Sequence, residues 1–328
     1  MRIFFTGGNG FVGNRTVRAA LNSGHEAHLL IRKTSNLSRL KNLDFTTSFG
    51  DILDYDSIVE ASKGCDACIH LACVSSWAEI KSPKLREIAL KGTENVIKAC
   101  LANSIKRFVY VSSISAINGT DTPEIQDETA SFTLGDSECL YAIAKHEAEE
   151  FVKSSCAEAG LEAVIVNLGE VYGPEDFGMI TAENVLNAIS PALIKPIIHG
   201  GFSAVHIDDA AAGIILALEK GRAGESYILA GDNVEVADFY HICQEIYGKS
   251  SYLIALPPDF LLKVMSVLSY FRLPLPVERE VLAYARRFFW MTSKKAELEL
   301  GYTHRGIHET LSPVVNWLVE SGRVKANK

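Results

Sequence analysis

The sequence predicts an α/β protein in which a doubly wound parallel sheet is followed by a smaller, mixed and mainly helical C-terminal unit. The chain opens on a short apolar run that leads into a glycine-rich turn and a helical pattern. Short apolar runs then alternate with helical patterns up to residue 168, and this rhythm stops after Gly173 and Pro174. Strands that alternate with helices pair in parallel through right-handed crossovers.

The elements of the first half follow from the change between short apolar runs and helical spacing. Strands are expected, in order, at residues 3–5, 27–31, 45–49, 68–72, 108–111 and 163–168. Helices are expected from the glycine turn to Leu21 and at residues 56–62, 83–102 and 137–159. Gly24, Gly64 and Gly160 each follow a helical pattern, and glycine commonly occupies the position after a helix.

The second half is less regular. Strands are expected at residues 203–206 and 227–229 and a helix at 208–220, followed by mainly helical chain that prolines interrupt near residues 257 and 275. We therefore expect a first domain at residues 1–168 with a return segment near 203–229. Residues 169–202 and 230–328 are expected to form a second domain that closes over the carboxyl ends of the strands.

The composition is that of a globular protein. The chain has 328 residues, 48% of them hydrophobic, and a net charge of −8, which argues against nucleic acid as a partner. An odd number of cysteines, seven, is spread along the chain and predicts reduced thiols and a cytoplasmic location. Cys65 and Cys68 spell C-x-x-C, but no second pair lies nearby, so we interpret them as buried thiols and predict no metal site.

No signal peptide and no membrane span are expected. The most apolar stretch, residues 260–273, is interrupted by Lys263 and Arg272 and is too short to cross a bilayer. We interpret it as a packed or substrate-facing helix.

The glycine turn at residues 6–13 reads Thr-Gly-Gly-Asn-Gly-Phe-Val-Gly. Such a turn brings backbone N–H groups to a helix N-terminus, where the partial positive charge favours a phosphate. Two registers fit a dinucleotide-binding turn, one with Gly8, Gly10 and Gly13 and one with Gly7, Gly10 and Gly13. Taken alone, the pattern also fits a purely structural turn.

Tyr141 and Lys145 lie four residues apart in a predicted helix and therefore share one face. A nearby ammonium lowers the pKa of a phenol, so the tyrosine can give a proton to a carbonyl oxygen or take one from an alcohol. Ser112 and Ser113 follow the strand at 108–111, where doubly wound sheets bind ligands. Their hydroxyls can hold a substrate oxygen or cap the next turn, and Ser115 is a further candidate.

Several stretches together resemble the extended short-chain dehydrogenase/reductases of the NAD-dependent epimerase/dehydratase family, which have a Rossmann fold. The matching stretches are residues 6–13, 50–51, 70–72, 111–113, 141–145, 166–174, 205–217, 224–231 and 294–302. The likeness covers nearly the whole chain and is greatest to the dihydroflavonol-reductase-like branch, which neighbours the sugar-nucleotide epimerases and dehydratases.

This resemblance implies a set of cofactor-binding residues. These are Gly7, Gly10, Phe11, Val12 and Gly13 at the phosphates, Asp51 and Ile52 at the adenine, Leu71, Ala72 and Cys73 at the adenosine and ribose, and Leu168 to Val171 near the nicotinamide. It also implies that Ser113 and Tyr141 are catalytic and that Lys145 binds the nicotinamide ribose and tunes the tyrosine. A structural hydrogen-bonding role is implied for His206, Asp208 and Asp209.

Three positions depart from the family pattern. Ala89 stands where the family usually has an asparagine that supports a proton relay, so the proton relay of this chain is expected to differ from that of the family. Leu168 replaces a frequent proline. One extra residue between Ser113 and Gly119 keeps Ser112 and Ser115 as alternative assignments for the catalytic serine.

The end of the second predicted strand indicates which cofactor is used. NAD enzymes place an acidic side chain there, and NADP enzymes place cations for the 2′-phosphate. Here Ile31 is followed by Arg32 and Lys33, and an arginine fork suits a phosphate. NADP(H) is therefore favoured over NAD(H), although Arg32 can instead stack on the adenine and admit both.

The function expected from these features is hydride transfer between a nicotinamide and a carbonyl or alcohol, with Tyr141 as acid/base. No basic cluster suited to a nucleotide diphosphate is evident, which favours an apolar or aromatic small-molecule substrate. A sugar-nucleotide epimerase or dehydratase with retained NAD, and a non-catalytic NADP-sensing regulator, remain as alternatives.

The resemblance also allows a homodimer through the helices at 83–102 and 137–159. Two locations, the lining of the substrate pocket and the core of the second domain, are compatible with the sequence positions of Trp77, Tyr172, Phe177, Met179 and Phe202.

Overall fold

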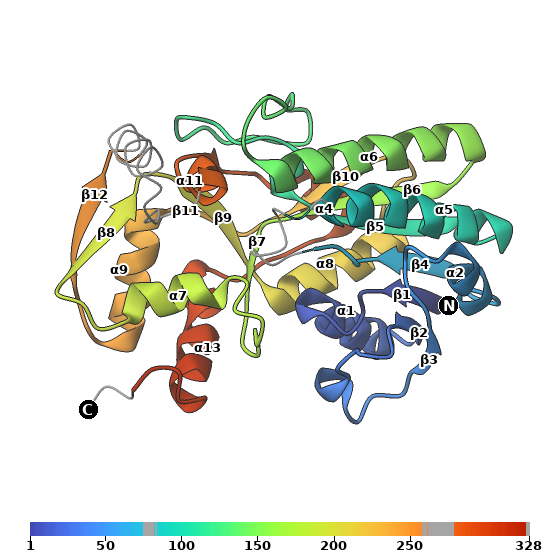
Figure 1. The fold of residues 1–328 in the computed structure, drawn as a ribbon, viewed down its shortest axis with the longest axis horizontal. Helices are drawn as coiled ribbons and strands as arrows, with labels where there is room; N and C mark the ends of the chain where they lie inside the picture. Colours follow the sequence, from blue (N-terminus) through green and yellow to red (C-terminus); the bar gives the residue numbers. More distant parts are fainter. Residues whose placement is uncertain (75–81, 83, 258–260, 262–278, 326–328) are drawn as a thin grey trace.

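The apolar runs of the first half form one seven-stranded parallel sheet in the computed structural model, which describes residues 1–74, 82, 84–257, 261 and 279–325 (Figure 1). Its strands are β1 (Arg2–Thr6), β2 (Glu26–Ile31), β3 (Thr46–Phe49), β4 (Ala67–His70), β5 (Arg107–Ser113), β6 (Glu162–Leu168) and β10 (Ser226–Leu229). Their order is β10-β6-β5-β4-β1-β2-β3, and every neighbouring pair is parallel. The predicted doubly wound sheet is confirmed. Its chain order reverses between β1 and β4, which is where such sheets bind ligands.

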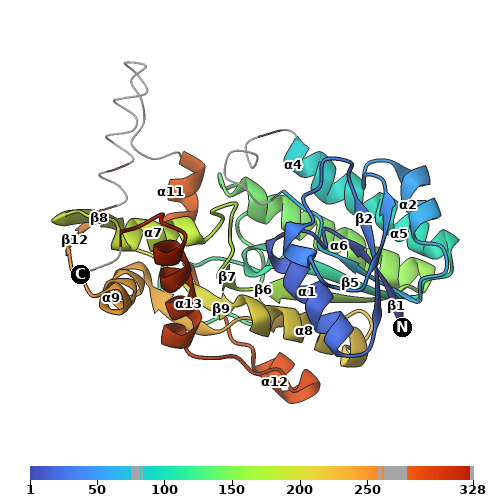
Figure 2. The same ribbon diagram turned by 90° about the horizontal axis from the view of Figure 1, so that it is seen from below.

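Helices cover both faces of this sheet (Figures 1 and 2). One face packs on α1 (Phe11–Asn22) and α8 (Ile207–Lys220), and the other packs on α2 (Tyr55–Ala61), α5 (Thr93–Ala102) and α6 (Leu140–Ala159). Successive side chains of each strand point to opposite faces of the sheet. In β1, Ile3 and Phe5 join the core under α1 and α8, whereas Phe4 joins the core under α5 and α6.

The helix predicted over residues 83–102 is interrupted. It comprises α4 (Lys84–Arg86), a π-helical segment η2 (Glu87–Gly92) and α5. Within it, the Thr93 hydroxyl donates to the Ala89 carbonyl at 2.6 Å. Gly92 lies against Ile52, because a Cβ on Gly92 would stand 2.6 Å from the Ile52 Cδ1. Helical spacing alone does not distinguish such a π segment from an α-helix, and π segments recur at functional sites.

The helix predicted at 137–159 begins at Leu140 instead. The Ser137 hydroxyl donates to the Leu134 carbonyl at 2.6 Å and accepts from the Cys139 N–H at 3.1 Å. These local bonds hold residues 134–139 in a turn ahead of the helix, as serine side chains often do.

The C-terminal part combines small sheets with helices, at the left of Figure 1. One sheet contains β7 (Glu170–Tyr172), β9 (Gly201–His206), β11 (Asp232–Glu235) and β13 (Phe288–Phe289), and another pairs β8 (Ile194–Ile198) with β12 (Tyr252–Leu256). The helices described are α7 (Ala182–Ile189), α9 (Val236–Tyr247), α11 (Arg279–Ala285), α12 (Lys294–Leu300) and α13 (Ile307–Glu320). The sequence missed α7 and most of these short strands, which are too brief to show a period.

Two polar contacts fix the start of α8, where the resemblance implied a structural hydrogen-bonding role for His206, Asp208 and Asp209. The His206 Nδ1 accepts from the Asp208 N–H at 3.1 Å and caps the helix. The Asp209 carboxylate accepts from the Arg305 backbone N–H at 2.9 Å and from its guanidinium at 2.7 Å. The contact joins α8 to the segment that leads into α13.

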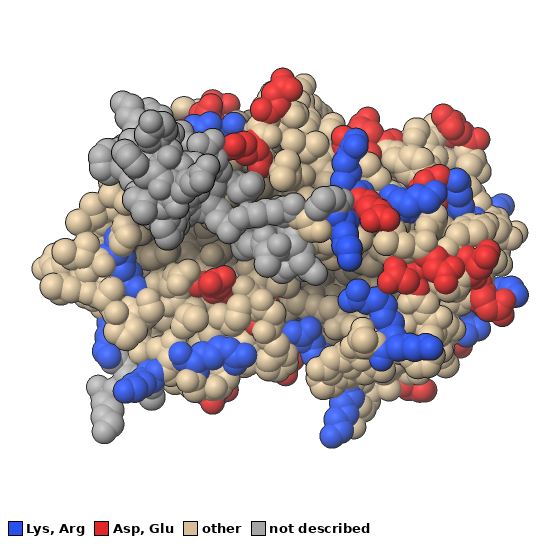
Figure 3. Space-filling model, viewed as in Figure 1, with Lys and Arg blue, Asp and Glu red and all other residues tan. Residues whose placement is uncertain are grey.

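On the right of the face drawn in Figure 3, Lys and Arg side chains are interspersed with Asp and Glu side chains. Among the residues that the structure describes, no helix is both long and apolar enough to cross a membrane. The apolar stretch at 260–273 lies outside the described residues except for Leu261, which is buried against Leu282.

Candidate active site

The glycine turn is packed tightly against the end of β4. Gly7 has φ +73°, and a Cβ there would lie 2.7 Å from the Ala72 backbone nitrogen. A Cβ on Gly13 would lie 2.1 Å from the Gly7 carbonyl oxygen. Two of the three glycines in the register Gly7, Gly10, Gly13 are therefore required by the protein's own packing.

Gly10 differs from the other two glycines. Its Cβ would have one heavy atom beyond its neighbours within 4 Å, the Gly7 carbonyl oxygen at 3.1 Å. Gly10 is also the N-cap of α1, where no side chain caps the helix and no acidic residue occupies the first turn. A helix end with free N–H groups and without negative charge suits a bound phosphate. The Phe11 side chain is buried in the core and that of Val12 is partly buried against it, which leaves their backbone N–H groups as the groups that this helix end can offer a phosphate.

The ends of the neighbouring strands surround the turn. The Leu71 N–H donates to the Thr6 carbonyl at 3.0 Å, which sets Leu71, Ala72 and Cys73 beside β1. After β3, the Asp51 carboxylate accepts from the Leu53 N–H at 3.0 Å, while Ile52 is buried. After β2, Ile31 is buried and Arg32 is exposed. All these predicted positions therefore follow strands at the same edge of the sheet.

Lys145 is buried between α6 and β5. Its Nζ donates to the Val111 carbonyl oxygen at 2.8 Å and to the Tyr110 phenol oxygen at 3.4 Å. Tyr141 is partly buried one turn earlier and packs with Ala89, Ala144 and the other members of a small apolar cluster. Burial raises the pKa of the Tyr141 phenol above its ordinary value, and the Lys145 ammonium opposes this shift.

As predicted, the Lys145 ammonium lowers the pKa of Tyr141, but burial raises that pKa by more, so the net shift is upward. The phenol of this structure is protonated near neutrality, which is the form that can donate a proton to a carbonyl oxygen.

Ser113 and Ser115 form a pair of hydroxyls at the end of β5. The Ser115 Oγ donates to the Ser113 Oγ at 3.0 Å, and the Ser115 N–H also donates to it at 3.3 Å. Tyr284 on α11 reaches this pair from the C-terminal part. Burial raises the pKa of the Tyr284 phenol, and the Ser115 hydroxyl acts in the opposite direction. Two of the three candidates for the catalytic serine, Ser113 and Ser115, are therefore neighbours in the structure. The third candidate, Ser112, is buried toward α6 near Glu149.

Glu149 is a buried carboxyl group that the sequence reading missed. Its Oε1 accepts from the Asn167 amide at 2.6 Å, and the same amide donates to the Ser113 carbonyl oxygen at 3.1 Å. Burial raises the pKa of Glu149 to about 7. The signal was available, because Tyr141, Lys145 and Glu149 are spaced by four residues on one helix face. Tyr284 had no comparable signal.

The remaining predicted residues lie in packed surroundings. Leu168 and Val171 have buried side chains in the core under α1 and α8. Tyr172 is fully buried, with its ring centroid 5.4 Å from that of Phe239. Phe177 is 54% exposed as a residue, and its ring meets that of Trp317 edge-on. Met179 and Phe202 pack against the same core as Tyr172. Trp77 lies outside the described residues.

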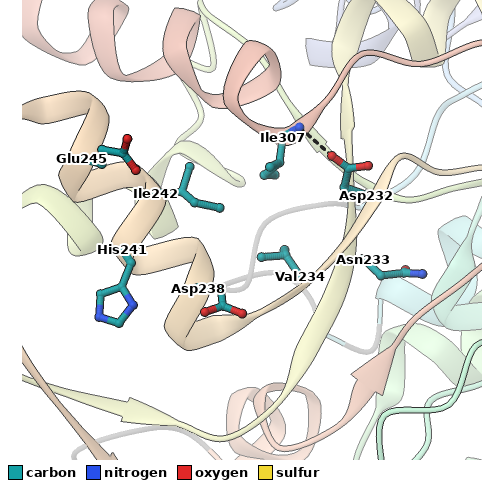
Figure 4. A pocket seen from close by; sticks show the side chains of 8 residues that line it. All are labelled: Asp232, Asn233, Val234, Asp238, His241, Ile242, Glu245 and Ile307. Atoms are coloured by element: carbon teal, nitrogen blue, oxygen red, sulfur yellow. Dashed lines mark hydrogen bonds between the residues drawn. The ribbon is translucent and has the colours of Figure 1, made fainter.

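One cavity of about 480 Å³ lies in the C-terminal part, between β11, α9 and the start of α13 (Figure 4). Its lining includes Asp238, His241 and Glu245, and the Asp232 carboxylate accepts from the Ile307 N–H at 2.7 Å. None of the predicted site residues lines it. Within the described ranges, no three His, Cys, Asp or Glu side chains are grouped to hold a metal ion.

Known proteins resemble this chain along most of its length. The profile of the NAD dependent epimerase/dehydratase family matches residues 3–230. A Synechocystis sp. protein with the provisional name dihydroflavonol 4-reductase is 27% identical over 331 residues, covering 98% of this chain and 96% of that protein. The sterol-4-alpha-carboxylate 3-dehydrogenase (decarboxylating) of Dictyostelium discoideum is 25% identical over 92% of this chain and 96% of its own length.

The crystal structure of gox2253 is similar over 98% of this chain and 99% of that chain, with a TM-score of 0.87 and 30% identity. The UDP-glucose 4-epimerase of Thermus thermophilus, solved in complex with NAD, covers 99% of this chain and has a TM-score of 0.76 at 22% identity. At that identity the likeness concerns the fold alone.

Proposed function

The chain belongs to the NAD-dependent epimerase/dehydratase family as an enzyme of the extended short-chain dehydrogenase/reductase type, and we propose that it reduces a carbonyl compound or oxidises the corresponding alcohol. The observation that carries this proposal is the placement of Tyr141 and Lys145. A protonated, partly buried phenol lies one helical turn from a buried ammonium, at the sheet edge where the glycine turn forms an uncapped helix end.

The residues present fit a nicotinamide dinucleotide. The cradle at Gly10, which a Cβ would narrow, and the free N–H groups at the start of α1 suit its pyrophosphate. Asp51 and Ile52 would hold the adenine side, and Leu71, Ala72 and Cys73 the adenosine ribose. Leu168 to Val171 and Lys145 would hold the nicotinamide end. When bound, the cofactor supplies or accepts the hydride.

The chain's own residues supply the proton chemistry. The Tyr141 phenol gives its proton to the substrate oxygen during reduction and takes one from the alcohol during oxidation. The Lys145 ammonium stabilises the phenolate and so lowers the cost of that transfer. The Ser113 hydroxyl, which accepts from Ser115, has its own proton free to donate to the substrate oxygen and orient it.

NADP(H) is the proposed cofactor preference, with NAD(H) also accepted. The support is the exposed Arg32 directly after β2, where no acidic side chain follows Ile31. A guanidinium binds a 2′-phosphate in a fork, whereas an acidic side chain would bind the ribose hydroxyls of NAD.

The proposed substrate is an apolar or aromatic carbonyl or alcohol. Support comes from the relative named as a dihydroflavonol 4-reductase, which matches 98% of this chain and 96% of its own length. A sugar-nucleotide epimerase or dehydratase is the second candidate, because the family whose profile matches this chain is that of NAD dependent epimerases and dehydratases. The NADP-sensing regulator ranks third, because the Tyr141 and Lys145 pair is present. A cytoplasmic homodimer built through α5 and α6 remains a prediction.

A screen that follows cofactor absorbance tests this proposal. Purified protein is incubated with NADPH or NADH and a panel of ketones and aldehydes, with alcohols and the oxidised cofactors in parallel. Nucleotide sugars are assayed separately by chromatography of their products. Consumption of NADPH with an apolar ketone supports the proposal. Isomerised or dehydrated nucleotide sugar without net cofactor consumption would replace it with the second candidate.

A further inference from the structure

The surroundings of the Lys145 ammonium are unusual in one respect: a second phenol, that of Tyr110, lies directly against it. Lys145 is 3% exposed and Tyr110 is 2% exposed. The Nζ donates to the Tyr110 oxygen at 3.4 Å and lies 4.8 Å from the centroid of its ring. The Val111 carbonyl, 2.8 Å away, is the other oxygen that accepts from it. Both the phenol oxygen and the ring face stabilise a buried cation.

Tyr110 also belongs to a row of buried polar side chains that leads away from Lys145. The Tyr110 and His70 rings have centroids 5.8 Å apart. The His70 Nε2 lies 3.1 Å from the Thr93 Oγ1, and that hydroxyl donates to the Ala89 carbonyl. Because the Thr93 proton is used on Ala89, the His70 Nε2 must carry the hydrogen and donate to Thr93.

The other side of His70 reaches the glycine turn. With its Nε2 protonated, a neutral His70 has an acceptor at Nδ1, and the Thr6 Oγ1 lies 2.5 Å from that atom. Burial and the Lys145 charge lower the pKa of His70 to about 3, so the ring is neutral at physiological pH. The Thr6 Oγ1 in turn accepts from the Ala72 N–H at 3.4 Å. The row therefore links Lys145 to the ends of β1 and β4, between which the proposed cofactor would bind.

The side chain at position 89 offers nothing polar to this region. Ala89 is 2% exposed and contributes a methyl group to the cluster with Tyr141, and its carbonyl is occupied by Thr93. The polar side chain that contacts the Lys145 amino group among the described residues is that of Tyr110.

We propose that Tyr110 is the positioning residue for Lys145: its phenol, together with the Val111 carbonyl, holds the ammonium in place, and the row Thr93, His70, Thr6 ties that place to the glycine turn. This inference rests on the proposed function, in which Lys145 supports Tyr141. The Tyr110 phenol accepts a hydrogen bond from Lys145, and none is described to Tyr141 or Ser113, so its positioning role runs through Lys145. Without the phenol oxygen, Lys145 keeps one accepting oxygen and gains freedom to move.

The experiment compares Tyr110→Phe with Tyr302→Phe. Both variants lose one buried phenol oxygen, but that of Tyr302 donates to the Ala230 carbonyl at 3.2 Å, in the core under α8. The first readout is the ¹⁵N ammonium resonance of Lys145 in lysine-labelled protein, assigned by its loss in Lys145→Arg. We expect Tyr110→Phe to shift or broaden this resonance and Tyr302→Phe to leave it unchanged.

The second readout is turnover on a substrate found by screening. In Tyr110→Phe, kcat should fall about tenfold, equivalent to a barrier increase near 1.4 kcal/mol, with KM within about twofold. The pH profile of kcat for alcohol oxidation should move to higher pH, because a displaced ammonium stabilises the Tyr141 phenolate less. The groups facing Lys145 whose charge bears on this profile are Tyr141, Glu149, Tyr110 and His70.

The two readouts separate this inference from the proposed function. If no substrate is turned over by the wild-type protein, the proposed function fails, and the Lys145 resonance still decides the role of Tyr110. Thr93 also hydrogen-bonds to Tyr110 through its hydroxyl. Should Tyr110→Phe fold poorly, Thr93→Val removes that hydroxyl and is expected to shift or broaden the Lys145 resonance. An unchanged Lys145 resonance in a folded Tyr110→Phe, or in folded Thr93→Val where that variant replaces it, overturns the proposal.

Discussion

Gly13 faces the Gly7 carbonyl so closely that a Cβ on Gly13 would stand 2.1 Å from that oxygen. Gly7 itself has a left-handed backbone at φ +73°. Gly10 has neither constraint, since its Cβ would lie 3.1 Å from the same oxygen. Two of the three glycines in this turn are therefore required by the fold, whereas the proposed role of Gly10 is to bind a ligand.

Gly13→Ala and Gly10→Ala should accordingly behave differently. Forcing a methyl group into the packed backbone at Gly13 is expected to cost about 3 kcal/mol or more of unfolding free energy. Gly10→Ala should change stability by less than about 1 kcal/mol yet weaken NADPH binding at least about tenfold. Urea unfolding and fluorescence titration with NADPH measure the two effects. Equal NADPH affinity in Gly10→Ala and wild type would refute the proposal that this turn binds the cofactor phosphates.

Glu149 should make stability depend on pH. Its pKa is about 7 in the folded protein against an ordinary 4.5. Between these two pH values, Glu149 is therefore protonated in the folded state and ionised in the unfolded state. The free energy of unfolding therefore falls as pH rises from about 5 to 7, by up to about 3 kcal/mol, and stays level above that. Glu149→Gln lacks this proton exchange and should gain stability relative to wild type as pH rises.

His70 acts in the opposite sense. Its pKa of about 3 lies below the ordinary 6.5, so the unfolded state binds the extra proton and stability rises with pH between these values. This contribution is common to both proteins and cancels in the difference between Glu149→Gln and wild type. Urea unfolding of the pair at pH 5 and pH 8 is the measurement, and a difference that stays constant between the two pH values would contradict the buried, protonated Glu149.

Asp209→Asn should destabilise the joint between α8 and the segment before α13. The carboxylate accepts from both the backbone and the guanidinium of Arg305, and loss of such charged bonds costs about 1–3 kcal/mol. The neighbouring Asp208 is 48% exposed at its side chain and makes only longer ion pairs. Asp208→Asn is thus a matched control and should cost no more than about 0.5 kcal/mol. Equal losses in thermal unfolding would argue against a specific role for Asp209.

Arg32 should set the choice of cofactor. Arg32→Ala is expected to lower kcat/KM for NADPH about tenfold relative to NADH, because the fork to a 2′-phosphate is lost. Lys33→Ala, at the adjacent exposed position, should have a smaller effect since a lysine provides a single point charge. A wild-type preference for NADH, or an unchanged ratio in Arg32→Ala, would refute the assignment.

The sequence predicted the sheet and the edge that carries the candidate site, because short apolar strands alternate with helices and each polar motif follows a strand. It also predicted that Tyr141 and Lys145 share a helix face. The π-helical segment at Glu87–Gly92 was missed, since helical spacing does not distinguish such a segment from an α-helix.

Contacts between distant segments were also beyond the sequence. Tyr284 reaches Ser115 from an element about 170 residues away in the chain, and no local pattern indicates such a contact. Burial likewise reverses the net shift expected for Tyr141, because the desolvation of a phenol depends on everything packed around it.

The most direct test of the account is the turnover of Tyr141→Phe. The variant keeps the ring and loses the phenol proton, so NADPH binding should stay within about threefold of wild type while kcat on the best substrate falls by about 10²–10⁴. Both values are measured on the same preparation, with folding checked by circular dichroism. Intact NADPH binding with that loss of kcat is the predicted result. Turnover within about twofold of wild type would contradict the assignment of Tyr141 as the acid/base.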